Sequence, residues 1–102
     1  MENYQEHYDK PESEKDEFLG IIAYVFYRQD FYWTVEKCVK LLQDKEIPIH
    51  EIQEEEDYIR IFVKPEEDRY TEDEDTYIRF EYITKDTCAN TVYRKYLSHK
   101  IL

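Results

Sequence analysis

The run of residues 19–27 (LGIIAYVFY) constrains the fold of this chain more than any other feature. It is apolar at odd and even positions alike and rich in β-branched and aromatic side chains, a pattern typical of a strand that is buried on both faces. The longest apolar run, residues 18–27, is too short for a membrane-spanning helix, which needs about 20 residues. The sequence therefore predicts a central strand of a sheet.

A helix and a hairpin are expected next along the chain. Asp30 can accept a hydrogen bond from the first free amides of a helix that runs to Lys45, whose apolar side chains recur at helical spacing: Val35, Cys38, Val39 and Leu42. Residues 47–53 combine a proline with alternating isoleucines, which is typical of a short edge strand. Residues 58–63 alternate in the same way, so the two segments are expected to pair as a hairpin.

An acidic segment without apolar periodicity, residues 64–75, separates this hairpin from the last part of the chain. Residues 76–83 are expected to form a strand with Ile78, Phe80 and Tyr82 inward. A second helix, capped by Asp86 or Thr87, is expected to follow, with an apolar stripe of Ala89, Val92, Tyr93, Tyr96 and Leu97. The two strand-helix units can be aligned, with Ile21 on Ile78, which suggests a degenerate internal duplication.

Together these elements predict an α+β fold. We expect two layers, a mainly antiparallel four-stranded sheet with two helices on one face, in the order β-α-β-β-β-α. A ferredoxin-like arrangement is the alternative, although residues 99–102 barely provide the final strand that it needs. Residues 1–17 are expected to be an acidic mobile arm and residues 18–102 a single domain, whose strand-helix halves are residues 19–45 and 76–98.

Acidic residues outnumber basic ones by 25 to 14, which gives a formal net charge of −11. Twelve of the carboxylates lie in residues 51–75, against three basic side chains. Because such charge repels phosphate backbones and anionic lipids, we expect no direct binding of nucleic acid or membranes. The charge would instead steer a basic partner toward the protein. The polar, acidic N-terminus is unlike a signal peptide, so an intracellular location is expected.

The chain offers no recognisable set of reactive residues. Its single glycine, Gly20, excludes the glycine-rich loops that bind nucleotide phosphates. The three histidines are scattered without metal-ligand spacing, and neither serine lies in a nucleophile motif. We therefore expect no enzyme activity, no cofactor and no metal site. A hydrolase that uses clustered carboxylates is the remaining enzymatic alternative.

Aromatic side chains are the strongest functional signal. Eleven tyrosines, five phenylalanines and one tryptophan exceed what a core of this size must hold, and such side chains favour interfaces. We expect a non-enzymatic module that binds a protein or peptide along a strand edge or between the two halves, with the anchors Phe31, Tyr32, Trp33, Tyr58 and Phe62. The alternative is an acidic decoy whose residues 51–75 imitate DNA phosphates. A homodimer is left open.

In its length, its wealth of tyrosine and glutamate, its single glycine and its lack of a catalytic motif, the chain resembles the small proteins of lipothrixviruses, filamentous viruses of hyperthermophilic archaea. The resemblance implies an accessory protein inside a host cell. It also bears on Cys38 and Cys88, which we expect to be buried apolar side chains. A disulfide between them is the alternative, and it becomes less unusual in a hyperthermophile, where intracellular disulfides are common.

Overall fold

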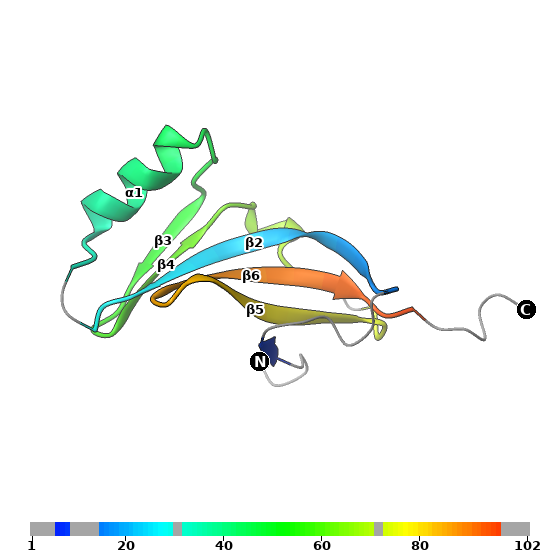
Figure 1. The fold of residues 1–102 in the computed structure, drawn as a ribbon. Coiled ribbons are helices and arrows are strands. Elements are labelled where there is room, and N and C mark those ends of the chain that lie inside the picture. The colour runs from blue at the N-terminus through cyan, green and yellow to red at the C-terminus, as the bar shows by residue number, and fades with distance from the viewer. Residues whose placement is uncertain (1–5, 9–14, 30–31, 71–72, 97–102) are drawn as a thin grey trace, which may run out of the picture.

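The computed structural model describes residues 6–8, 15–29, 32–70 and 73–96. These residues form one six-stranded sheet in the order β1-β5-β6-β2-β4-β3, one α-helix and one 3-10 turn (Figure 1). Neighbouring strands run antiparallel except β1 and β5, which are parallel. The elements are β1 (Glu6–Tyr8), β2 (Glu17–Tyr27), α1 (Val35–Asp44), β3 (Glu51–Glu54), β4 (Tyr58–Phe62), η1 (Glu66–Asp68), β5 (Thr76–Thr84) and β6 (Thr87–Arg94). The α+β class is therefore confirmed.

Strand β2 is central, as its apolar run predicts. It pairs with β4 on one side and with β6 on the other, and the register with β6 shifts twice, between Phe18 and Gly20 and between Ile21 and Ala23. Gly20 lies at the first of these irregularities with a φ of 142°, a conformation that side chains rarely adopt. A Cβ atom there would also lie 2.8 Å from Nζ of Lys64. The only glycine of the chain therefore stands where the backbone requires one.

The prediction of a second helix is wrong. Residues 87–94 form β6, which pairs with β5 through a tight turn at Lys85 and Asp86. Seven of the eight residues of β6 are buried, and polar residues such as Asn90 and Thr91 are buried on both faces of the strand beside apolar ones, so the sequence shows no alternation with a period of two. Apolar residues then match helical spacing by chance. Because residues 76–94 form a hairpin and not a strand followed by a helix, the proposed duplication and the ferredoxin-like alternative lose their basis.

The first helix and the hairpin agree with the sequence, with small changes at their ends. Helix α1 is capped by Thr34, whose Oγ1 accepts a hydrogen bond from the backbone N–H of Lys37 at 3.2 Å. The predicted cap, Asp30, lies outside the described residues. Strand β3 is an edge strand and pairs with β4, as expected. Within the predicted acidic arm, β1 adds a short parallel strand to β5.

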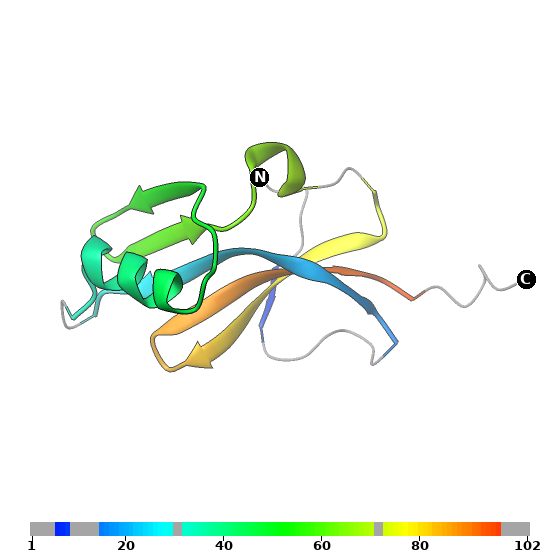
Figure 2. The same ribbon diagram turned by 90° about the horizontal axis from the view of Figure 1, so that it is seen from above.

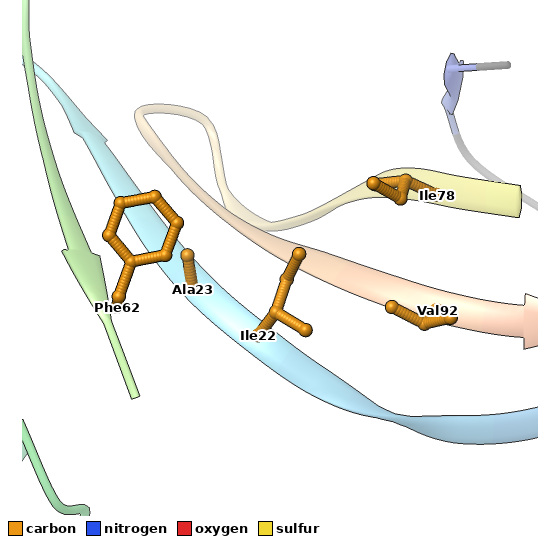
Figure 3. Packing of buried hydrophobic residues seen from close by; sticks show 5 residues of the cluster. All are labelled: Ile22, Ala23, Phe62, Ile78 and Val92. Atoms are coloured by element: carbon orange, nitrogen blue, oxygen red, sulfur yellow. The ribbon is translucent and has the colours of Figure 1, made fainter. Parts of the chain in front are cut away.

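The sheet carries an apolar core on each side. On one side, which we call the helix face, α1 packs over strands β2 and β4 in a cluster of Phe26, Cys38, Leu42, Ile59 and Ile61. The other side, which we call the far face, carries a second cluster of Ile22, Ala23, Phe62, Ile78 and Val92 (Figure 3). Seen from above, α1 lies over the β3–β4 end of the sheet, and the turn between β5 and β6 lies beside the helix without cover from it (Figure 2).

The first part of the predicted acidic loop is folded against the far face. Arg69 is buried there, with its guanidinium 3.9 Å from the ring centre of Phe62. Its Nη1 lies 2.7 Å from a carboxylate oxygen of Glu51, and its Nε donates to the carbonyl of Lys64 at 2.9 Å. The acidic residues that follow β4 are therefore anchored by one buried arginine.

Candidate functional site

A cleft of about 430 Å³ opens between α1 and the uncovered β5–β6 turn. Its floor is formed by Tyr24 and Phe26 of β2 and Thr87 of β6, and its helix wall by Leu41 and Leu42. The remaining lining residues are Trp33, Lys45, Ile47, Ile83 and Thr84. Most of this lining is apolar, and the volume falls within the range of about 300–1,000 Å³ that ligand sites occupy.

Trp33, the only tryptophan of the chain, stands at one end of this cleft. It lies directly before the helix cap, and its ring packs on Phe26 with the centroids 4.7 Å apart. Tyr32 meets it edge to face at 5.0 Å and remains exposed to solvent. The indole N–H is directed toward the Asp86 carboxylate without completing a hydrogen bond with it. Tryptophan fluorescence would therefore report on this end of the cleft alone.

A second, more open hollow of about 260 Å³ adjoins the cleft and shares Trp33 and Leu41 with it. Its other lining residues are Tyr32, Lys37, Lys40 and Asp44. The ammonium group of Lys37 lies 3.9 Å from the centre of the Tyr32 ring and donates to the Tyr32 carbonyl at 3.0 Å. Lys40 and Asp44 form an exposed ion pair at 3.3 Å. The two hollows together are lined by three lysines and one aspartate.

The opposite wall of the cleft is the end of the β5–β6 hairpin. Ile83 lies at a register shift of β5 and is 59% exposed, the most exposed of the large apolar side chains in the described residues. The turn beyond it is held by Asp86, which accepts hydrogen bonds from the hydroxyls of Thr84 at 2.9 Å and Thr87 at 3.2 Å. The Thr84 hydroxyl, with smaller contributions from Trp33 and Thr87, lowers the pKa of Asp86. An exposed isoleucine is thus presented on a well-ordered turn.

No protein-family model, no curated protein and no solved structure matches this chain. In the part of the chain that the structure describes, no group of three or more histidine, cysteine or acidic side chains is placed to hold a metal ion. No helix in the same residues is long and apolar enough to cross a membrane.

The structure separates the five predicted anchors. Trp33 lines the cleft, and Tyr32 lies beside it in the adjoining hollow. Tyr58 and Phe62 point to the far face, because they alternate with Ile59 and Ile61 of the helix face. Phe62 is buried in the core under Arg69. The fifth anchor, Phe31, lies outside the described residues. The predicted groove between two strand-helix halves is replaced by a cleft between one helix and the sheet.

Two residues that shape the cleft, Leu41 and Ile83, were missed from the sequence. The signal for Ile83 was available, because Tyr82 and Ile83 are adjacent large apolar side chains at the end of a strand, and both cannot point to one face. Leu41 lies beside the predicted apolar stripe of α1, so it widens that stripe toward the cleft. An overly wide stripe on a helix indicates a second contact surface.

Both cysteines are free, buried thiols. Cys38 lies under α1 on the helix face, whereas Cys88 lies on the far face, with its sulfur 3.7 Å from the Tyr27 hydroxyl. Since the sheet separates them, the structure agrees with two buried apolar side chains and holds no bond between them. Burial raises the pKa of the Cys38 thiol to about 12, and burial also raises the pKa of Cys88. Neither thiol is activated as a nucleophile.

Proposed function

We propose that this protein is a non-enzymatic module that binds a peptide or protein segment in the cleft beside α1. The observation that carries the proposal is the exposure of Ile83 opposite Trp33 and Leu41 across an open apolar hollow. Apolar side chains that line a concave surface lose their contact with water when a partner covers them, and this loss drives binding. Trp33 is also of the residue type most often found to dominate binding energy at interfaces.

The polar groups around the cleft support binding more than catalysis. The hydroxyls of Thr84 and Thr87 are engaged with Asp86, and Asp44 is paired with Lys40. The base bonded to the two threonine hydroxyls is the Asp86 carboxylate, whose lowered pKa makes it a poor acceptor of their protons. These polar groups fix the walls of the cleft, as a rigid binding surface requires.

Six exposed carboxylates favour the acidic decoy as a second candidate: Glu55, Glu56, Asp57, Glu66, Glu67 and Asp68. By contrast, Glu51 and Glu54 are paired with Arg69 and Arg28. A decoy of this kind would bind a basic, nucleic-acid-binding protein, and its affinity would fall steeply as salt rises. An affinity that is unchanged between low and high salt would remove this candidate.

The peptide-binding proposal is tested by selection from a displayed library of random peptides of about 15 residues, roughly four helical turns. Peptides enriched on the wild-type protein should bind Ile83→Glu at least about tenfold more weakly, because the substitution places a charge in the apolar wall. The matched control is Ile52→Glu, in β3, since Ile52 is also an exposed isoleucine at 40% and does not line the cleft.

Both variants alter exposed side chains, so they should keep the wild-type circular dichroism spectrum and thermal unfolding. Peptides that bind Ile83→Glu as tightly as the wild type would place the binding surface elsewhere. Failure to enrich any peptide family would count against a peptide-binding role altogether.

A further inference from the structure

The floor of the cleft leaves no strand edge for a partner to extend. Strands β2 and β6, which form the floor, are interior strands whose neighbours on both sides are already in place. A partner must therefore enter by packing side chains, and a helix laid in a groove is the common mode for that. The cleft borders the C-terminal half of α1 at Leu41 and Leu42, and the adjoining hollow continues along the helix to Lys37. Helix α1 has ten residues and is about 15 Å long. A second helix placed there would complete a layer that α1 only begins.

The flank of α1 that borders the cleft is basic. Lys37, Leu41 and Lys45 follow each other at intervals of four positions, and side chains at this spacing lie above one another on a helix. Among the described residues neither lysine is paired with a carboxylate: Lys37 contacts Tyr32, and the one aspartate in the lining is paired with Lys40. Hence a protein with a net charge of −11 lines the cleft and the adjoining hollow, taken together, with an excess of positive charge.

We infer that the occupant of the cleft is an acidic amphipathic helix that lies alongside α1, an inference that rests on the proposed function. The two lysines are eight positions apart, about 12 Å along the helix axis. The occupant would carry carboxylates at a similar separation on one side, with apolar residues between them. The apolar residues enter between Trp33 and Ile83, while the carboxylates meet Lys37 and Lys45 at the rim.

A second copy of this chain fits the cleft less well. In a twofold symmetric pair, the same surface meets itself, so the lysine-bearing flanks of the two α1 helices would face each other. Like charges placed together at an interface disfavour association. The acidic exterior of the protein would also repel an acidic partner at long range. At about 0.15 M salt that repulsion is screened beyond about 8 Å, whereas contacts at the rim are retained.

The test uses three synthetic helical peptides that share their apolar positions and lack tryptophan. One carries glutamates two turns apart at the flanking positions, the second glutamines and the third lysines. Titration at about 0.15 M salt, followed by the fluorescence of Trp33, gives the three dissociation constants. We expect the acidic peptide to bind about tenfold more tightly than the glutamine peptide, and the basic peptide to bind most weakly.

Charge reversal on the protein completes the test. Lys37→Glu and Lys45→Glu should each weaken the acidic peptide severalfold and strengthen the basic one. The control is Lys85→Glu, which changes the net charge equally but affects an exposed turn residue that does not line the cleft. It should leave the order of the three peptides unchanged.

The remaining outcomes separate this inference from the proposed function. Equal binding of all three peptides, lost in Ile83→Glu, would overturn the acidic helix and leave a cleft that accepts any apolar segment. If none of the three peptides bound while library peptides still did, the acidic helical occupant would be overturned and the proposed peptide-binding function would be retained. Sedimentation that shows a dimer of the wild type and a monomer of Ile83→Glu would identify the occupant as a second copy and also overturn it.

Discussion

The two ends of the helix face differ in the kind of side chain that is buried there. Under α1 the buried residues are apolar, and Phe26, Leu42 and Ile59 are almost completely excluded from solvent. Between β5 and β6 the same face carries Tyr77, Arg79, Thr91 and Tyr93, which are also buried. We call these regions the apolar end and the polar end. The apolar end gains stability from the volume of its packed side chains. The stability of the polar end depends on hydrogen-bonding groups that must be present together.

The polar end is held by a short network of charged and phenolic groups. The Tyr93 hydroxyl donates to a carboxylate oxygen of Glu81 at 2.9 Å, and Nε of Arg79 donates to the same oxygen at 3.2 Å. The rings of Tyr77 and Tyr93 stack 5.8 Å apart, and the Tyr77 hydroxyl donates to Asp16. Removing one member of such a network leaves its partners buried without compensation. The polar end should therefore tolerate paired changes better than single ones, unlike the apolar end.

The largest effect is expected at the apolar end. Leu42→Ala should lower the free energy of unfolding by about 3 kcal/mol, because it removes a fully buried side chain that the surrounding strands and helix cannot replace. Leu42→Met, which conserves volume, should cost less than about 1.5 kcal/mol. Urea unfolding followed by the fluorescence of Trp33 measures both. Equal losses in the two variants would show that packed volume does not govern this end.

A smaller effect, of a different form, is expected at the polar end. Arg79 is 1% exposed and its charge is balanced by Glu81, so Glu81→Gln should cost about 2 kcal/mol. This is below the usual cost for breaking a fully buried pair, because the Glu81 side chain is 27% exposed. The double variant Arg79→Met and Glu81→Gln should be more stable than the sum of the single losses predicts, by about 1 kcal/mol. Additive losses would contradict a network at this end.

The same contrast explains how far the sequence could predict the fold. Helix α1 and the β3–β4 hairpin were predictable, because each shows the period of its element, and strand β2 was predictable from its continuous run of β-branched and aromatic side chains. Strand β6 was not predictable, since both of its faces are buried and carry residues as different as Thr91 and Val92. Its sequence therefore shows no alternation of polar and apolar residues. Buried polar groups such as Arg79 carry no pattern in a sequence, because their burial depends on partners that only the folded sheet brings together.

The candidate site was predictable only in part, for a related reason. Tyr32 and Trp33 were among the predicted anchors because the chain has more aromatic side chains than its core must hold, and such side chains favour interfaces. The wall opposite, at Ile83, depends on the position of a hairpin that was expected to be a helix. Once β6 is a strand, the β5–β6 turn lies beside α1 and the cleft follows from the topology.

The smallest effect that distinguishes the polar end from the apolar end is a dependence of the free energy of unfolding on pH in the alkaline range. Burial of Tyr93, together with its hydrogen bond to Glu81 and the charge of that carboxylate, raises the pKa of its hydroxyl above the usual value near 10. The folded protein therefore holds this proton more tightly than the unfolded chain does. The resulting contribution to stability is complete below about pH 10 and is lost as the pH rises through the raised pKa.

Tyr93→Phe should cost about 1 kcal/mol at pH 7, where it removes a hydrogen bond, and less at pH 11. The decline of stability above pH 10 should become shallower but not vanish, since the pKa values of Tyr24 and Cys38 are also raised by burial. Leu42→Ala removes no titrating group and should keep the slope of the wild type. Unfolding in urea at pH values from 7 to about 11 provides the comparison. If Tyr93→Phe and Leu42→Ala gave parallel pH profiles, the network at Glu81 would contribute only its volume, and the two ends would not differ.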